Sequence, residues 1–492
     1  MPGLLVRQPS CGPIRLPPWS IAAVVLCAVA SWSGRCSATQ PPTAAATQRV
    51  DPARFDPRVR GLVTITHVGR DQWRFEYDLS RDARSIMLGP KAEKYHATAW
   101  QLPEAFHVLP QGPYSFLERR DGEPFRQVVI EVRSYHPVVP YAPQPFAVFD
   151  NGTAVNTGPL GFAARIGETR MMMAFVPKYS FVGTPDETVV VPGKKPGAVT
   201  RIELPQRPFV YFGKLDGLRE TDRVQSILDS DFPSGLTEPY VASVEAYAAL
   251  YDRRLRDALP DKLVIMVAYQ TAPGLGFGGG AQQFQIMAKA RGPQALAADG
   301  HTLQKMRLFF AHEMAHIWQT RLGNDTARWF TEGEAELLAL YALQQQGHIT
   351  PEEVAKNLSA RVPRCVDSLR RSSLLEAHRR GDPQANYTAG ALVVAAALAA
   401  TAADGTREDI AALDRALHTW PADARMKRPL EAFQETLKKL GAAPQALDAI
   451  GSFIRTRHDD PLAALRQLFD VTDLAYRAEG PALHIAPAPN SR

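Results

Sequence analysis

The chain has 492 residues, a length that predicts two or three domains rather than one hydrophobic core. Its 45% hydrophobic and 22% charged content is typical of a globular protein and excludes an intrinsically disordered one. The formal net charge of +5 is small for this length, and no long run of lysine and arginine occurs, so the sequence does not favour nucleic-acid binding.

The first 38 residues have the organisation of an export signal. Arg7 and Arg15 precede the apolar run WSIAAVVLCAVASW, and small residues follow where a signal peptidase can cut. The apolar run is shorter than the ~20 residues of a membrane-spanning helix, so we expect no stable span after cleavage. The sequence therefore predicts a signal peptide at 1–38 and a periplasmic or secreted protein, with a retained N-terminal membrane anchor as the alternative.

Three of the four cysteines, Cys11, Cys27 and Cys36, lie in or beside the proposed signal peptide, so the mature chain keeps only Cys365. A single cysteine forms no internal disulfide, and the fold therefore does not depend on an oxidising compartment. Any metal ion must be held mainly by histidine, aspartate and glutamate side chains.

The N-terminal half of the mature chain is dominated by strand signals. Residues 39–60 are rich in Pro, Thr, Ala and Gln and predict a flexible lead-in. QWRFEYDL at 72–79 alternates apolar and polar residues with the period of a half-buried strand. Turn clusters interrupt such segments, and Asn151-Gly152 predicts a hairpin turn. We therefore expect a β-rich domain at 61–206.

From residue 207 the pattern changes to helices mixed with buried strands. TEPYVASVEAYAALYDRRLRDAL predicts a helix with Thr237 as N-cap, and KLVIMVAY predicts a buried strand. The glycine-rich PGLGFGGG lacks the Gly-Lys-Ser/Thr ending of a phosphate-binding loop, so we interpret it as a loop leading into a strand. Two amphipathic helices follow, HTLQKMRLFFAHEMAHIWQTRLG and TEGEAELLALYALQQQG, and the remainder predicts helices. We expect a second domain at 207–400, a helical domain at 401–480 and a tail at 481–492.

The first of these amphipathic helices contains HEMAH, in which His312 and His316 lie four residues apart. Positions i and i+4 are neighbours on one helix face, so both imidazoles can reach one ion at about 2.0–2.1 Å. Glu313 lies one step round the helix, where its carboxylate can take a proton from water on the ion. The flanking residues are apolar, and a metal would satisfy two histidines and a glutamate that are costly to bury without partners. The pattern therefore predicts a metal site rather than a solvated helix face.

A catalytic zinc ion needs a third protein ligand and one open position for water. Glu332 follows His316 by sixteen residues, at the start of the next predicted helix, and is the expected third ligand. Glu336 lies one turn further on the same face and can orient a ligand histidine by contacting its other ring nitrogen. The alternative, that these acids only favour a helix N-terminus electrostatically, is the explanation that we adopt for Glu334.

HEMAHIW followed by WFTEGEAEL resembles the signature of the gluzincin metallopeptidases, HExxH and then a glutamate in a W-x-x-E-G-x-x-E context. Within that clan the sequence is similar to the aminopeptidase N family and its glycyl aminopeptidase relatives, with Trp329, Glu332 and Gly333 at matching positions. The spacing between the second histidine and the ligand glutamate is slightly shorter than is usual there. The resemblance implies an α+β fold with an N-terminal β-rich domain, a thermolysin-like zincin catalytic domain at 207–400 and a C-terminal helical region.

A third segment, ANYTAGALVVAAAL at 385–398, resembles the family segment in which a tyrosine precedes a glycine and an apolar helix. The resemblance implies that Tyr387 donates a hydrogen bond to the tetrahedral oxyanion, a role that suits a phenol. A core tyrosine bonded to backbone is the alternative.

One element of the family pattern is absent. The G-x-M-E-N strand of the aminopeptidase N family carries a glutamate that grips the free amine of the substrate, and the corresponding GFGGGAQQFQIM has glutamines and no acid. A neutral amide pairs only weakly with an ammonium group, so aminopeptidase specificity is not predicted. The strand can still bind an extended peptide by edge pairing.

Together these features predict an exported metallopeptidase with one zinc ion on His312, His316 and Glu332. It would hydrolyse peptide bonds by a zinc-bound water, with Glu313 as general base and Tyr387 as oxyanion donor. We expect a peptide or protein substrate and no nucleic acid. Two alternatives stay open, a non-peptidase zinc hydrolase on the same scaffold and an inactive zincin-fold binding protein. The sequence does not indicate the cleavage preference or the oligomeric state.

Overall fold

The computed structural model describes residues 58–89, 93–135, 145–167, 171–197, 199–203, 208–256, 258–274, 276–282, 284–319, 327–401, 413, 415–416, 428–480 and 482–487. The proposed signal peptide and most of the lead-in lie outside these residues. Among the helices of the described ranges, none combines the length and the apolar composition that crossing a membrane requires.

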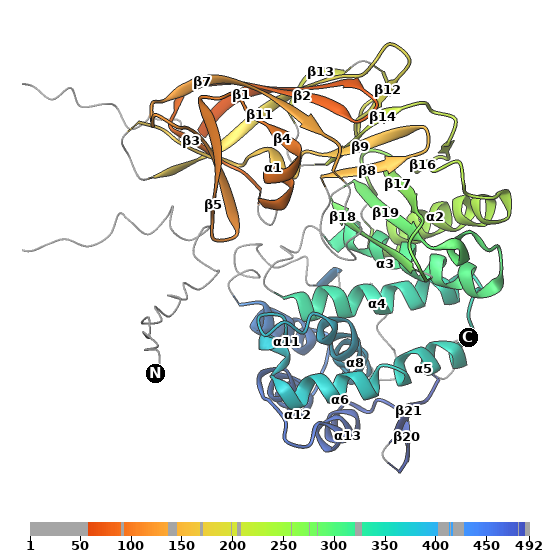
Figure 1. The fold of residues 1–492 in the computed structure, drawn as a ribbon. Helices are drawn as coiled ribbons and strands as arrows, with labels where there is room; N and C mark the ends of the chain where they lie inside the picture. Colours follow the sequence, from red (N-terminus) through yellow and green to blue (C-terminus); the bar gives the residue numbers. More distant parts are fainter. Residues whose placement is uncertain are drawn as a thin grey trace, which may run out of the picture. The chain divides into compact units, whose positions relative to one another are not determined.

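The N-terminal strands form a ten-stranded sheet (Figure 1). Its members are β1 (Arg58–Gly69), β2 (Gln72–Ala83), β3 (Ser85–Met87), β4 (Trp100–Gln101), β5 (Phe106–Gln111), β6 (Tyr114–Arg119), β7 (Phe125–Arg133), β10 (Ala163–Arg165), β11 (Met172–Val182) and β13 (Val199–Glu203). β1 pairs in parallel with β11 and antiparallel with β2. The alternation predicted for 72–79 is confirmed, because Trp73, Phe75, Tyr77 and Leu79 are buried in β2. The short helix α1 (Glu93–Ala99) precedes β4.

A second, four-stranded sheet contains β8 (Phe146–Phe149), β9 (Gly152–Asn156), β12 (Thr188–Val190) and β14 (Phe209–Gly213), in the order β12-β14-β9-β8. β8 and β9 form the predicted hairpin, but Phe149 pairs with Gly152, so the turn residues are Asp150 and Asn151. Gly152 serves packing rather than the turn, because a Cβ there would lie 2.4 Å from the Tyr211 hydroxyl. β14 pairs with β9, so this sheet extends past residue 206.

A third, five-stranded sheet contains β15 (Leu218–Glu220), β16 (Val224–Leu228), β17 (Leu263–Gln270), β18 (Gly276–Gln282) and β19 (Gln285–Arg291), in the order β15-β16-β17-β19-β18. β16, β17 and β19 are parallel, and β18 is an antiparallel edge strand. The loop predicted at PGLGFGGG is wrong from Gly276 onward, because these glycines belong to β18. The strand was missed because glycine has no side chain and so shows no alternation of apolar and polar residues. Glycine is needed at position 279, because a Cβ there would lie 2.1 Å from the carbonyl oxygen of Met287.

The second and third sheets share a buried cluster that includes Phe149 and Tyr211 from one and Val264 and Met287 from the other. Gln285 of β19 links them further. Its side-chain oxygen accepts a hydrogen bond from the Phe209 N–H at 2.7 Å, and its amide nitrogen donates to the Phe209 carbonyl at 2.7 Å. The amide of Gln285 therefore pairs with Phe209 as a neighbouring strand would.

The remaining elements are mainly helices. They are α2 (Ser234–Leu255), α3 (Gly300–Gln319), α4 (Arg328–Gln345), α5 (Pro351–Ser359), α6 (Val362–Arg371), α7 (Leu374–Ala377), α8 (Gln384–Ala400), α11 (Pro429–Lys439), α12 (Pro444–Arg455) and α13 (Pro461–Thr472), with short 3-10 turns at Gly158–Leu160 and Pro293–Leu296. α2 begins three residues before Thr237, and the Thr237 hydroxyl donates to the Phe232 carbonyl at 3.4 Å instead of capping the helix. The prediction of Thr237 as N-cap is therefore wrong.

α8 is the most deeply buried helix of the C-terminal region, with contacts to α4, α6 and α13 (Figure 1). Its alanine-rich composition gives it small side chains on every face, so these neighbours can approach closely. The end of the chain differs from the prediction, which was a helical domain at 401–480 followed by a tail at 481–492. β20 (Tyr476–Glu479) and β21 (Ala482–Ile485) form a hairpin, with Gly480 at φ +58° in its turn.

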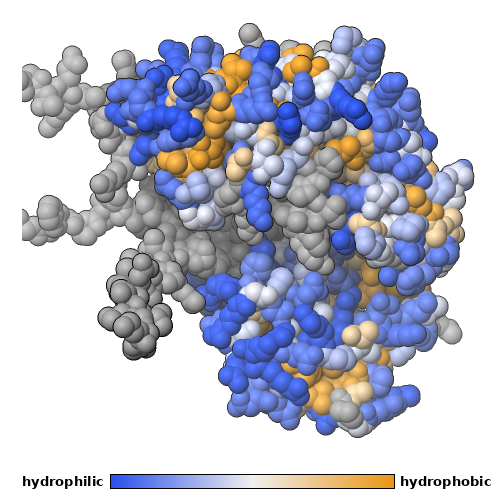
Figure 2. Space-filling view, viewed as in Figure 1, coloured by the Kyte–Doolittle hydropathy of each residue, from blue (hydrophilic) through white to orange (hydrophobic). Residues whose placement is uncertain are grey.

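The face seen in Figure 2 is mostly hydrophilic, with patches of hydrophobic residues. Exposed large hydrophobic side chains include Val129 of β7 and Val176 of β11 in the ten-stranded sheet. The described residues thus contain an N-terminal β-rich region, a mixed sheet with helices and a C-terminal helical region. This confirms the predicted α+β class.

Candidate metal centre

The predicted metal-binding helix is α3, and its apolar side chains anchor it in the core. Phe310, Met314 and Trp318 are almost completely buried among the neighbouring helices. His312 and His316 lie one turn apart on another face, with side chains 9% and 15% exposed. The helical period therefore holds both imidazoles together while the aromatic residues fix the helix.

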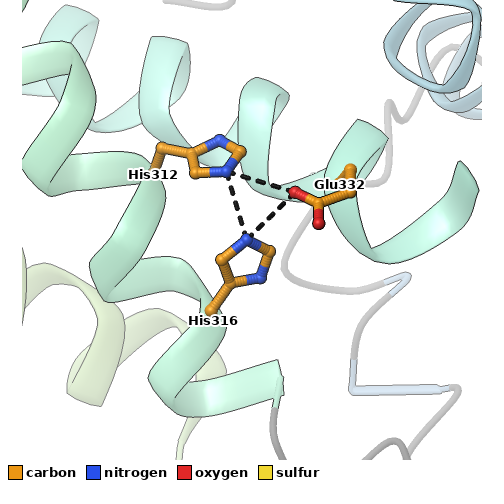
Figure 3. Close-up of side chains that lie close together, drawn as sticks. All are labelled: His312, His316 and Glu332. Carbon is orange, nitrogen blue, oxygen red and sulfur yellow. Dashed lines mark hydrogen bonds and ion pairs between the residues drawn. The ribbon is translucent and has the colours of Figure 1, made fainter. Parts of the chain in front are cut away.

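Glu332, in the first turns of α4, completes a three-residue cluster with these histidines (Figure 3). The Nε2 atoms of His312 and His316 are 3.1 Å apart. Glu332 Oε2 lies 3.4 Å from His312 Nε2 and 3.2 Å from His316 Nε2. The structure thus brings together the three predicted metal ligands from two helices.

The donor set fits a zinc ion. Glu332 Oε2 is fully buried without a hydrogen bond, as expected of an atom that ligates a metal. Burial lowers the pKa of His312, but Glu332 and Glu336 outweigh this effect and raise it to about 10. Burial opposes ionisation of Glu332, yet the two histidines hold its pKa well below the usual range. The cluster therefore stabilises positive charge at its centre, as a divalent cation requires.

His312 is held from behind by an ion pair. Its Nδ1 lies 3.2 Å from Glu336 Oε1, and the other oxygen of Glu336 contacts the guanidinium of Arg361, the residue before α6. Burial raises the pKa of Glu336, but His312 and Arg361 together lower it below its ordinary value. Glu336 takes the place behind a ligand histidine that we predicted for it, whereas Arg361 was not predicted.

His316 is held by a different group. Its Nδ1 lies 2.7 Å from the side-chain oxygen of Gln319, whose amide nitrogen donates to Glu334 Oε2 at 2.7 Å and to the Thr331 carbonyl at 3.2 Å. Gln319 and Glu334 are both 0% exposed. The prediction that Glu334 acts only on the helix N-terminus is therefore wrong. Gln319 was not predicted, although its position three residues after His316, on the same side of the helix, could have indicated a contact with that histidine.

The two further predicted catalytic residues adjoin the cluster. The rings of Tyr387, on α8, and His312 stack with centroids 5.7 Å apart and an interplanar angle of 24°. Burial raises the pKa of Tyr387, and the charges of Glu332 and Glu313 raise it further. Glu313 is half-buried on α3, and its negative charge therefore acts on the Tyr387 hydroxyl.

β18 contacts α3, the helix that carries both histidines. The rings of Phe277 on β18 and Phe309 on α3 stack at a centroid distance of 6.2 Å. Within Gly276–Gln282 no side chain is acidic, which agrees with the absence of the amine-binding glutamate noted in the sequence. An open strand edge therefore flanks the candidate metal centre without a carboxylate of its own.

Comparison with known proteins supports the fold. No family model matches the sequence, and no curated protein matches it. A solved structure of an aminopeptidase N family protein from Idiomarina loihiensis matches with a TM-score of 0.61 and 12% identity, over 83% of this chain and 78% of that chain. An M1 zinc metallopeptidase from Deinococcus radiodurans matches with a TM-score of 0.44 and 13% identity, over 82% and 93%. Leukotriene A4 hydrolase from Saccharomyces cerevisiae matches with a TM-score of 0.47 and 10% identity, over 84% and 72%.

The first of these likenesses is strong enough to establish a shared architecture, although the sequences have diverged widely. It covers 83% of this chain and 78% of that chain. The resemblance predicted from HEMAHIW and WFTEGEAEL is thereby confirmed at the level of fold. The chain has the fold of an aminopeptidase N family protein.

Proposed function

We propose that this protein is an exported, zinc-dependent metallopeptidase that hydrolyses peptide bonds. The observation that carries the proposal is the convergence of His312, His316 and Glu332 beside Glu313 and Tyr387. These are the groups that a water-activating hydrolase requires, namely a metal-binding triad, a proton acceptor and a hydrogen-bond donor. The shared fold with an aminopeptidase N family protein supports it.

His312, His316 and Glu332 would hold the single zinc ion. When bound, such an ion acts as a Lewis acid on water and on the substrate carbonyl. The protein's contribution is to keep the three ligand atoms within 4.8 Å of one another in a largely buried setting. Glu336 and Gln319 hold the outer ring nitrogens of the two histidines, so the inner nitrogens face Glu332.

Glu313 serves as general base and then as general acid. Its carboxylate accepts a proton from the water as the water oxygen attacks the carbonyl carbon. The carboxylic acid then gives that proton to the leaving amine nitrogen as the C–N bond breaks. A carboxyl group suits both halves of this cycle, because it accepts the proton as an anion and donates it as an acid.

Tyr387 donates a hydrogen bond to the oxyanion that develops on the substrate carbonyl oxygen. Because the pKa of Tyr387 is raised, the phenol stays protonated at neutral pH and keeps its O–H for this purpose. The stacking of its ring on His312 limits its movement. This favours the catalytic role over that of a core tyrosine.

The substrate we infer is a peptide bound in an extended conformation. β18 is an edge strand next to α3, and such an edge can pair with a peptide backbone. Since β18 has no acidic side chain to hold a free amine, we expect peptides with blocked N-termini to be cleaved as well as free ones.

Cleavage profiling by mass spectrometry tests the function. The mature, zinc-loaded protein is incubated with a peptide library in free and N-acetylated forms, and we expect chelator-sensitive cleavage of both. Glu313→Gln should retain zinc by elemental analysis yet lose hydrolysis, because an amide cannot accept the proton. Glu238→Gln, on α2, is a matched control for the loss of one negative charge and should cleave like the parent.

Cleavage of free peptides alone would contradict the expected cleavage of blocked peptides and would indicate an aminopeptidase. Two other outcomes would contradict the proposal itself. Chelator-sensitive hydrolysis of esters without any peptide cleavage indicates a different zinc hydrolase. Zinc binding without activity on any substrate indicates a binding protein.

Export rests on the signal-like sequence at 1–38. N-terminal sequencing of protein recovered from the periplasm or medium should give a start near residue 39. An uncut N-terminus in the membrane fraction would instead indicate the anchored form.

A further inference from the structure

We propose that Gln319 and Glu334 are positioning residues that fix the tautomer and orientation of His316 for zinc binding. The inference rests on the zinc site of the proposed function and not on peptide hydrolysis. It concerns two fully buried polar side chains that take no part in the proton transfers and bond changes of hydrolysis.

The orientation of the Gln319 amide follows from its partners. One end of the amide faces the Thr331 carbonyl at 3.2 Å and Glu334 Oε2 at 2.7 Å. A backbone carbonyl only accepts hydrogen bonds, so this end must be the NH₂ group, which has two protons to donate. The opposite end, 2.7 Å from His316 Nδ1, is therefore the amide oxygen.

The tautomer of His316 follows in turn. An amide oxygen can only accept, so Nδ1 of His316 must carry a proton. In a neutral imidazole the other nitrogen then has the lone pair, and Nε2 is the atom that lies 3.2 Å from Glu332 Oε2. Glu334 thus acts through Gln319 to present the ligating nitrogen of His316 to the metal centre.

The same hydrogen bonds join the two helices that supply the ligands. Gln319 is the last residue of α3, whereas Thr331 and Glu334 lie on α4 on either side of Glu332. A single buried amide therefore holds the end of α3 against the turn of α4 that carries the third ligand. Loss of this amide should both free the His316 ring and loosen the position of Glu332.

The two ligand histidines also differ in the charge of their partners. His312 faces a carboxylate, Glu336, whereas His316 faces a neutral amide. A carboxylate makes an imidazole more electron-donating than an amide does. The Gln319 partner thus aligns His316 while adding less electron density to the metal.

Zinc affinity of the full-length mature protein, measured by competition with a chromogenic chelator, tests the proposal without any substrate. Gln319→Leu removes the hydrogen bonds at nearly constant volume, and we expect about 10- to 100-fold weaker zinc binding. Thr302→Val is the matched control, because the buried Thr302 lies on the same helix and its hydroxyl donates to the Gln294 carbonyl at 3.0 Å, a hydrogen bond that valine removes. It should bind zinc like the parent.

An exchange of the two groups keeps the test decisive if Gln319→Leu does not fold. Gln319→Glu still accepts from His316 but places a carboxylate against Glu334, so zinc binding should weaken. Adding Glu334→Gln replaces the repulsion between the two carboxylates with a hydrogen bond but leaves a carboxylate oxygen facing the Thr331 carbonyl. The double variant should therefore bind zinc more tightly than Gln319→Glu alone and less tightly than the parent, as expected of coupled partners. The visible spectrum of the Co²⁺-loaded protein should change in the single variants and return in part toward the parent spectrum in the double variant.

Parent-like zinc affinity in a folded Gln319→Leu protein, or no recovery in the double variant, would overturn the proposal. A parent protein that binds zinc but cleaves no peptide would overturn the proposed function instead. The two failures are therefore distinguishable.

Discussion

Gly333 of α4 and Gly390 of α8 lie in direct backbone contact. A Cβ added to Gly333 would lie 2.3 Å from the carbonyl carbon of Gly390, and one added to Gly390 would lie 2.1 Å from the carbonyl oxygen of Trp329. Glu332 directly precedes Gly333, and Tyr387 lies three residues before Gly390. The contact between the two glycines therefore helps to set the distance between Glu332, the proposed metal ligand, and Tyr387, the proposed oxyanion donor.

Gly390→Ala should destabilise the protein by about 1–3 kcal/mol or more, because the added methyl group overpacks a helix crossing. Urea unfolding of parent and variant measures this loss. Gly300→Ala is the control, since Gly300 also lies in a helix but has no atom within 4 Å of an added Cβ. It should be neutral or slightly stabilising. Equal stability of Gly390→Ala and the parent would show that α4 and α8 can separate at little cost.

Tyr387→Phe should lower kcat by about 10²–10³-fold, because it removes one hydrogen-bond donor to the oxyanion. Zinc content and KM should change little, since the ring and its stacking on His312 remain. Steady-state kinetics on a cleaved peptide provide the measurement. Tyr240→Phe, which removes the hydroxyl 3.0 Å from Ser226 in the core, should leave kcat unchanged. A parent-like kcat in Tyr387→Phe would show that the Tyr387 hydroxyl does not stabilise the oxyanion and would favour the alternative of a core tyrosine.

Arg361→Met should cost about 3–5 kcal/mol of stability, because it removes one of the two cationic partners of the largely buried Glu336 carboxylate and leaves only His312. Arg364→Met, one turn along α6, breaks only a 3.8 Å contact between the half-exposed Arg364 and Asp382. That control should cost about 0–1 kcal/mol. Equal losses in the two variants, determined by urea unfolding, would contradict the importance assigned to the Arg361–Glu336 pair.

Removal of zinc should lower the stability of the protein. A ligand that binds only the folded state stabilises it by about 4 kcal/mol at a free concentration 1,000 times its Kd. The melting temperature should therefore fall when the mature protein is treated with a chelator and recover on adding Zn²⁺. The melting temperature of His316→Ala should be the same in the untreated, chelator-treated and zinc-supplemented protein. If chelator and zinc also left the melting temperature of the parent protein unchanged, this cluster would not be a metal site.

Asp229→Asn should stabilise the protein at pH 8 but not at pH 4. Burial raises the pKa of Asp229 to about 6, and the charge of Asp150 adds to this effect. The folded state therefore holds the proton more tightly than the unfolded state, and stability falls as pH rises from about 4 through 6. Asparagine removes this penalty and can still accept from the Tyr269 N–H, which lies 3.1 Å from Asp229 Oδ2.

The expected gain from Asp229→Asn at pH 8 is about 2 kcal/mol, shrinking to zero near pH 4. Urea unfolding at a series of pH values measures it. Asp231→Asn, at an exposed position two residues further on, should show no such dependence. A gain that is the same at all pH values would point to a cause other than ionisation of Asp229.

Local periodicity accounts for what could be predicted from the sequence. The alternation in β2 and the four-residue spacing of His312 and His316 are properties of a single strand or helix, so they are visible in one short segment. Glu332 was predictable because it follows on the next helix within a recognisable pattern. In these cases the chemistry depends on residues that are close in the chain.

The missed features depend on contacts between distant segments or on residues without a side-chain pattern. Arg361 reaches Glu336 from 25 residues away, across a helix–helix corner. Glu334 resembles an ordinary acidic residue near a helix start until its burial against Gln319 is known. The glycines of β18 carry no periodicity, and the hairpin at 476–485 is too short to show one.

The pairing of Gln285 with Phe209 has a consequence for how this protein can be divided. A polypeptide beginning after β14 would leave the Gln285 amide and the apolar residues of β17 and β19 facing water. Such a fragment should aggregate when produced alone, although it contains all the proposed catalytic residues. The β-rich region is thus a folding partner of the metal-binding region, and we expect evolution to transfer the two as one inherited unit.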